Sequence, residues 1–266
     1  MKKTLSLKPT PGKDLARYLG QYPDEHVALL DFSELLEDGT LDPLSRANET
    51  GHVVTSGLVL DQTQERVLVI DHLVLKRWLP PGGHYEGSGS LMASARREVL
   101  EETGVAAIEP IRLADGTSLL DINKHRIPAN PAKAEGEHWH FDFLYLFQAA
   151  GDVALTAQED EVAGVKWLSL EEFAATGSRA ARATSKLQAY FQDRVVAATL
   201  EADNAREASI AAAPREIPGE TPPDVSAFFD ALSGQSDDDE AQEPDALEDD
   251  EPPLTVADLA SLSLFR

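Results

Sequence analysis

Hydrophobic and polar residues follow two different periods along this chain, and each period predicts a different kind of element. In the middle of the chain, short aliphatic runs and alternating segments are typical of β-strands. Proline, glycine and polar residues separate these runs, as expected for turns. We therefore predict strands at residues 53–60, 66–70, 108–113, 138–147 and 165–168, with a long connection at residues 114–136.

Helical spacing is found on both sides of these strands. Met92, Ala95 and Val99 recur at i, i+3 and i+7, which predicts a helix that packs on a sheet and ends at Gly104. Strands around such a helix, with further helices on the faces, describe a layered α/β domain. Other helices are expected near residues 15–19, at 31–36 before Gly39, after the cap residue Ser169, and at 179–205.

The chain divides into four segments by pattern and composition. They are a helical N-terminal segment at 1–50, the α/β domain at 51–175, a helical extension at 176–212 and an acidic tail at 213–266. Residues 216–265 hold fifteen acidic residues and no Lys or Arg. Such a segment buries too little apolar surface to offset its conformational entropy, so we predict that it is largely disordered.

Two short amphipathic segments interrupt the tail, at residues 224–232 and 255–265. Each has apolar residues at helical spacing and could dock in a groove of a partner protein. The alternative is that these segments fold back on this domain or on a second copy of the chain in a homodimer.

Charge and composition exclude several classes of protein. The formal net charge of −24 opposes broad nucleic-acid binding, which needs a basic surface, but is compatible with a nucleotide held through a metal. The chain has no cysteine, which excludes disulfides and thiolate metal sites and suits a reducing compartment. The basic start lacks a following apolar core, and no run reaches the ~18 apolar residues of a membrane span. We expect a soluble cytoplasmic protein without a signal peptide.

Three acidic residues near the end of the central helix carry the main chemical signal. Glu98, Glu101 and Glu102 lie at i, i+3 and i+4, so their carboxylates project from one face. The negative end of the helix dipole makes acids costly there, and Arg97 offers only a partial counter-charge. A hard divalent cation such as Mg²⁺ removes this conflict. The alternative is a solvated acidic face.

The surrounding residues resemble the Nudix box, G-x5-E-x7-R-E-U-x-E-E-x-G-U, in which U is aliphatic. Eight of nine specified positions match over residues 83–105, without a gap. The departure is Gly89, which stands where the pattern has its first glutamate. The matching residues are Gly83, Arg97, Glu98, Val99, Glu101, Glu102, Gly104 and Val105.

The Nudix resemblance implies a fold and a reaction. The fold is a mixed sheet sandwiched between helices. The reaction is attack of water on a diphosphate, with Mg²⁺ or Mn²⁺ held by the three box glutamates and one glutamate helping to activate water. Arg97 would orient the carboxylates, and Gly82 and Gly83 would let the backbone approach metal or phosphate. Gly89 lacks the missing charge, so we expect it to affect metal geometry and rate more than fold.

The resemblance also points to a general base on a later loop. Glu161 is our candidate, with Glu159 and Asp160 as neighbouring alternatives. The non-catalytic alternative is that these residues form a solvated acidic turn. Glu86 could add a metal ligand or lie on the surface. Family relatives that isomerise an isoprenoid diphosphate use a cysteine, and this chain has none.

Histidines form a second group of candidates. His138, His140 and Asp142 share one face of the predicted long strand. They could bind zinc with a third ligand, line the substrate cleft, or form an ordinary polar strand face. His84, next to Gly83, could contact a phosphate.

The sequence therefore predicts a metal-dependent hydrolase of a diphosphate bond in a nucleoside diphosphate derivative, a small-molecule substrate. The competing hypothesis is a catalytically weak binding or regulatory module of the same fold that acts through its acidic tail. Residues 114–136 and the long strand are where we expect substrate selection.

Overall fold

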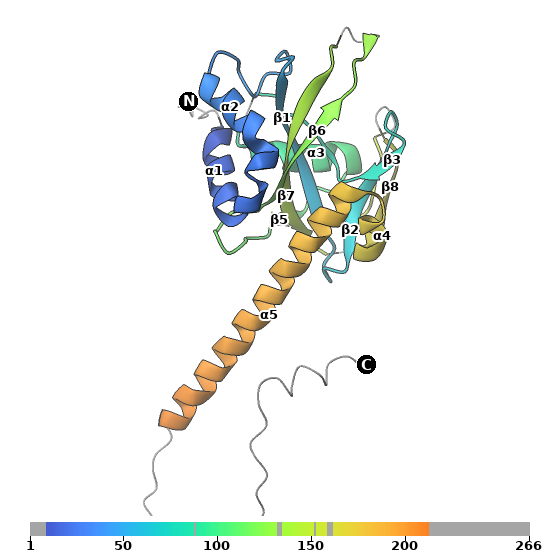
Figure 1. The fold of residues 1–266 in the computed structure, drawn as a ribbon. Helices are drawn as coiled ribbons and strands as arrows, with labels where there is room; N and C mark the ends of the chain where they lie inside the picture. The colour runs from blue at the N-terminus through green and yellow to red at the C-terminus, as the bar shows by residue number, and fades with distance from the viewer. Residues whose placement is uncertain (1–8, 88, 132–134, 152, 159–161, 213–266) are drawn as a thin grey trace, which may run out of the picture. The chain divides into compact units, whose positions relative to one another are not determined.

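The described residues of the computed structural model, 9–87, 89–131, 135–151, 153–158 and 162–212, form a mixed sheet with helices (Figure 1). The predicted acidic tail and its two amphipathic segments lie outside these residues. The strands are β1 (Gly51–Leu60), β2 (Arg66–His72), β3 (Arg77–Leu79), β4 (Gly82–His84), β5 (Ile108–Pro110), β6 (Leu119–Ile127), β7 (His138–Ala149) and β8 (Val162–Ser169).

Two long strands form the centre of the sheet. β1 and β7 pair in parallel over ten residues, and every residue of β1 is buried. Parallel pairs need cover on both faces, which explains why both strands are rich in aliphatic and aromatic residues. The other strands pair antiparallel: β2 and β4 on β1, β5 and β6 on β7, and β3 and β8 on β2.

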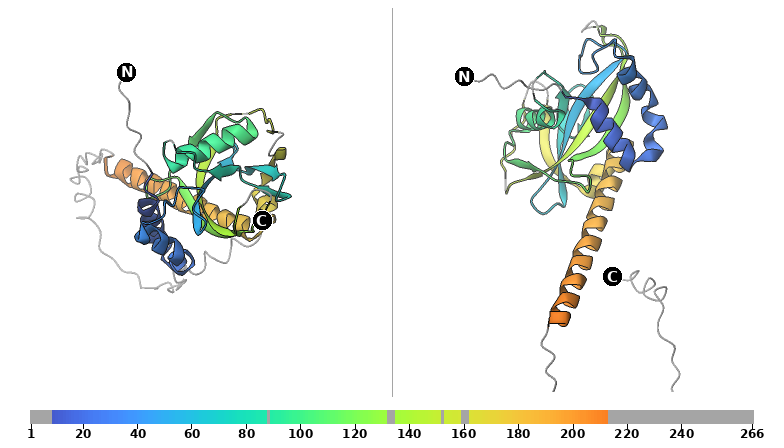
Figure 2. Two further views of the ribbon diagram at one scale, coloured as in Figure 1. Left: turned by 90° about the horizontal axis from the view of Figure 1, so that it is seen from above. Right: turned by 90° about the vertical axis from the view of Figure 1, so that its left-hand side faces the viewer.

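Helices complete the two cores of the domain. Residues of α1, α2 and α3 share one hydrophobic core with the sheet, and residues of α4 and the start of α5 share the other. α3 and α5 lie on opposite sides of the sheet (Figure 2). The expected mixed sheet sandwiched between helices is thus confirmed. The helices are α1 (Pro11–Gln21), α2 (Leu30–Asp38), α3 (Leu91–Thr103), α4 (Leu170–Ala174) and α5 (Ser178–Ala212), with 3₁₀ turns at Pro23–Glu25 and Val27–Leu29.

The N-terminal helices pack on the sheet. The Phe32 ring of α2 stacks on Phe141 of β7, with ring centroids 4.2 Å apart. Asp121 of β6 accepts hydrogen bonds from Tyr18 of α1 at 2.9 Å and from Lys186 of α5 at 2.7 Å. This buried carboxylate therefore ties both terminal helices to the same strand.

One prediction was wrong and several boundaries differ. The expected connection at 114–136 contains β6, which pairs antiparallel with β7. Its first four residues are buried while the rest are mostly half-buried polar residues, so the strand lacks a clear period. β5 is shorter than expected, and the short strands β3 and β4, which were not predicted, flank Pro80 and Pro81.

Two predicted helix boundaries are confirmed. Gly39 ends α2 in the left-handed conformation. Ser169 caps α4, and its hydroxyl accepts a hydrogen bond from the backbone of Glu172. No helix among the described residues is long and apolar enough to cross a membrane.

Candidate active site

The site is built on α3, whose two ends are fixed locally. The hydroxyl of Ser90 accepts a hydrogen bond from the backbone N–H of Ala93 at 3.1 Å and caps the first turn. Gly104 ends the helix in the left-handed conformation, and its N–H donates to the carbonyl of Leu100. Ala95 and Val99 are fully buried against the sheet, as the apolar stripe predicted.

The three box carboxylates differ in exposure. Glu98 and Glu102 are buried, with 8% and 4% of their surface exposed, whereas the side chain of Glu101 is 47% exposed. The backbone N–H of Gly82 donates to Oε2 of Glu102 at 2.8 Å. The turn before α3 is therefore attached to the carboxylate face by the main chain.

Arg97 connects the remaining carboxylates. Its Nη2 donates to Glu98 and its Nη1 to Glu101, both at 2.6 Å. Nη1 also lies 3.3 Å from the exposed carboxylate of Glu86. Nη2 donates in addition to the carbonyl oxygen of His84 at 3.1 Å. One guanidinium thus bridges three carboxylates and the end of β4.

Electrostatics at this face favour a further cation. Burial raises the pKa of Glu98 to about 7, and although Arg97 opposes this rise, the charges of Glu101 and Glu86 add to it. Glu98 therefore stays partly protonated at neutral pH, which means that Arg97 alone does not supply enough positive charge to ionise it fully. The three carboxylates offer oxygen ligands, which suit a hard divalent metal.

The glycines before α3 are required by close packing. A Cβ on Gly83 would lie 2.7 Å from the carboxylate atoms of Glu98, and one on Gly82 would lie 2.7 Å from the carbonyl of Thr55. Gly89, where the box pattern has a glutamate, has a φ of +78°, which L side chains rarely adopt. The local backbone here thus disfavours the glutamate of the pattern.

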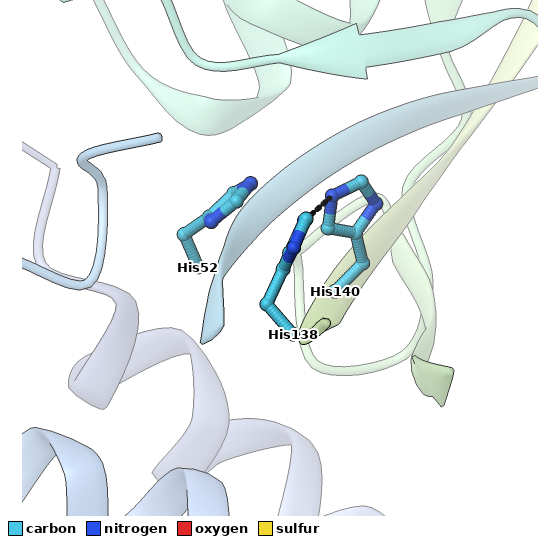
Figure 3. Close-up of side chains that lie close together, drawn as sticks. All are labelled: His52, His138 and His140. Carbon is cyan, nitrogen blue, oxygen red and sulfur yellow. Dashed lines mark hydrogen bonds between the residues drawn. The ribbon is translucent and has the colours of Figure 1, made fainter. Parts of the chain in front are cut away.

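Three histidines lie close together (Figure 3). They are on the face of the sheet away from α3, because they alternate along β1 and β7 with residues of the core that α3 shares. His138 and His140 lie together as expected, with their Nε2 atoms 3.2 Å apart. His52 of β1, which pairs in register with His140, brings a third ring. Asp142 does not join them, because its carboxylate accepts from Ser56 at 2.8 Å and pairs with Arg179 of α5 at 2.5 Å.

Two further histidines, His84 and His125, lie next to this group. The His84 ring centroid lies 5.1 Å from those of His52 and His140, and the His125 centroid lies 5.4 Å from that of His140. Burial is the main cause that lowers the pKa of His140 to about 2, of His125 to about 3 and of His84 to about 4. These rings are therefore neutral at physiological pH.

The structure thus separates the predicted site residues into two groups. Strand β4 presents Gly83 toward Glu98 and the His84 ring toward the histidines, because successive residues face opposite sides. The candidate base Glu161 and its neighbours Glu159 and Asp160 lie outside the described residues. His52 was not among the predicted site residues, because only the pairing of β1 with β7 brings it to His140.

Comparison with known proteins identifies the family of this chain. The family model of the NUDIX domain matches residues 51–188, so it extends past residue 175 into α5. The "Probable DHNTP pyrophosphohydrolase" of Lactococcus lactis subsp. cremoris is 32% identical over 143 residues, which are 54% of this chain and 78% of that protein. The chain therefore belongs to the Nudix family.

Solved structures are also similar to about half of this chain. An Ap4A hydrolase from C. elegans is 14% identical, with a TM-score of 0.41 over 53% of this chain and 98% of that one. The dihydroneopterin triphosphate pyrophosphohydrolase of E. coli is 15% identical, with a TM-score of 0.39 over 53% of this chain and 95% of that one.

Proposed function

We propose that this Nudix-type pyrophosphohydrolase cleaves a diphosphate bond in a nucleoside diphosphate derivative and depends on a divalent metal. The observation that supports this most directly is the carboxylate face of α3. Glu98 and Glu102 are buried there, and Arg97 holds Glu98 and Glu101 at 2.6 Å. Acids placed at the negative end of a helix are costly and call for a bound cation.

Each residue of the face has a role in this proposal. Glu98, Glu101 and Glu102 would hold Mg²⁺ or Mn²⁺. Such a metal offsets charge on phosphoryl oxygens and lowers the pKa of water. Arg97 fixes two carboxylates, and the N–H of Gly82 fixes the third. Glu161 is the candidate base that takes the proton from the attacking water.

The reaction is a hydrolysis that leaves two phosphorylated fragments. Water attacks one phosphorus, the P–O bond of the bridging oxygen breaks, and the proton of the water leaves to a base. The name of the relative from Lactococcus lactis contains DHNTP, the abbreviation of dihydroneopterin triphosphate. This compound should therefore be tested as a substrate together with nucleotides.

Product analysis across a panel of diphosphates tests this proposal. The panel holds nucleoside triphosphates, sugar nucleotides, ADP-ribose, dinucleoside polyphosphates and dihydroneopterin triphosphate, each with Mg²⁺ and with Mn²⁺. We expect metal-dependent cleavage of at least one compound and its loss in the Glu101→Gln/Glu102→Gln variant. Ligand binding without turnover on any compound would instead support the regulatory module that acts through the tail.

A further inference from the structure

The histidines at the start of β1 and β7 form a compact set of nitrogen donors. One ring nitrogen each from His52, His138 and His140 lies within 4.8 Å of the others. Figure 3 shows His52 on β1 facing the two β7 rings, with His138 and His140 joined by a close contact. His52 and His138 are buried, with 1% and 8% of their surface exposed.

Hydrogen bonds to the main chain fix which nitrogen of two rings carries a lone pair. Nδ1 of His138 lies 2.8 Å from the carbonyl of Gly136, and Nδ1 of His52 lies 3.2 Å from the carbonyl of Asn48. A carbonyl oxygen only accepts, so both Nδ1 atoms carry the proton. In the neutral form of each ring the lone pair is then on Nε2, and Nε2 of His138 faces that of His140.

One of these lone pairs has no partner within the described part of the chain. Nε2 of His52 is buried and makes no hydrogen bond there. Nε2 of His140, the third ring of the set, already lies 3.2 Å from that of His138. Leaving the buried Nε2 of His52 unsatisfied is costly, and a cation held by the three rings would satisfy it.

The separation of the two β7 rings agrees with a tetrahedral metal, and the donor atoms of all three rings lie within 4.8 Å of one another. Zinc binds imidazole nitrogen at about 2.0–2.1 Å, which places two tetrahedral ligands about 3.4 Å apart. The separation of 3.2 Å between Nε2 of His138 and Nε2 of His140 is close to that value. Histidines that bind zinc commonly donate the other ring N–H to a carbonyl, as His52 and His138 do here.

We propose that His52, His138 and His140 form a second metal site, selective for a zinc-like transition metal. The site is separate from the carboxylate face of α3, because Gly83 of β4 faces Glu98 whereas the His84 ring faces the histidines. Neutral imidazoles bind Zn²⁺ well, whereas Mg²⁺ prefers oxygen. The inference does not depend on the hydrolase proposal.

Metal binding to the untagged full chain tests this site. After chelator treatment, Zn²⁺ is titrated and bound metal is counted by mass spectrometry, with Co²⁺ as a spectroscopic substitute. We expect one Zn²⁺ per chain at the histidines, and a tetrahedral Co²⁺ spectrum. Loss of a residue that only supports a metal ligand lowers metal affinity by roughly 10–100-fold. Since His138 would be a ligand itself, His138→Ala should lower the affinity for Zn²⁺ by more than that.

Two controls make the outcome decisive. His26→Ala removes an exposed histidine outside the cluster and should leave binding unchanged. Glu101→Gln/Glu102→Gln should also retain the metal. Zinc that persists in His138→Ala but is lost in the carboxylate variant would overturn the proposal, as would no saturable binding to the wild type. Should His138→Ala not fold, X-ray absorption of the wild-type zinc complex decides between nitrogen ligands and an oxygen-only shell, and the latter overturns it.

Discussion

The guanidinium of Arg97 donates a hydrogen bond to the main-chain carbonyl of His84 at 3.1 Å. Arg97 belongs to α3, and His84 ends the short strand β4 that separates the carboxylates from the histidines. The same guanidinium binds Glu98 and Glu101. Arg97 therefore holds the carboxylate face in a fixed position relative to β4.

Removal of this guanidinium should impair hydrolysis more than folding. We expect Arg97→Gln to lower kcat/KM by roughly 10–100-fold, the usual effect of losing a residue that orients metal ligands. Arg96→Gln is the matched control, because Arg96 is the exposed neighbour and its guanidinium donates to the carbonyl of Ala106 at 3.5 Å. Steady-state kinetics on both variants check this, and equal losses in the two would contradict the assigned role.

Glu98 should make metal affinity depend on pH near neutrality. Its carboxyl has a pKa raised to about 7, mainly by burial, and binds a cation only when deprotonated. The apparent affinity for Mg²⁺, measured by calorimetry, should therefore rise with pH up to about 7 and then level off. The measurement covers pH 5 to pH 8, about two pH units below and one above that pKa. An affinity that does not change over this range would contradict a ligand role for Glu98.

The same carboxyl should destabilise the metal-free protein at high pH. Its pKa rises from 4.5 to about 7 on folding, so the folded state binds the proton more tightly. Stability from this group is present below the lower value and is lost as pH rises through the higher one. In thermal unfolding with EDTA, Glu98→Gln should gain Tm relative to wild type as pH rises across this window. A constant difference across the window would refute this.

The close approach of Gly83 to Glu98 predicts a specific loss. A Cβ at this position would lie 2.7 Å from the carboxylate and must displace it. We expect Gly83→Ala to lower activity on the order of 100-fold, as misplacement of a catalytic group by ~1 Å can. Activity assays beside circular dichroism check this, and a folded variant with full activity would show that the position of Glu98 is unimportant.

Restoring the glutamate of the box at Gly89 should not help. Its φ of +78° strains any L side chain, so Gly89→Ala and Gly89→Glu should each cost about 1 kcal/mol of unfolding free energy. Gly20→Ala is the contrasting control: Gly20 lies inside α1 with open space around it, so alanine should stabilise the protein by up to about 1 kcal/mol. Denaturant unfolding measures both, and a stabilised Gly89→Glu with higher activity would contradict this.

The sequence predicts local features of this protein better than distant contacts. The box helix, its cap at Gly104 and its apolar stripe depend on neighbouring residues, and the structure has them as predicted. β6 was missed because its second half is polar and its order comes from pairing with β7. His52 lies far from His140 in sequence, and only the parallel register of β1 and β7 brings the two rings together.

The measurement that tests the central claim most directly is the dependence of the hydrolysis rate on Mg²⁺, on the substrate that the wild type turns over fastest. The carboxylate face predicts saturable activation in the wild type and in Glu37→Gln, a control at an exposed acid of α2. It predicts no activation in Glu101→Gln/Glu102→Gln and no turnover with EDTA. Hydrolysis that continues in EDTA, or that responds equally to Mg²⁺ in the double variant, would contradict the claim that these carboxylates bind the catalytic metal.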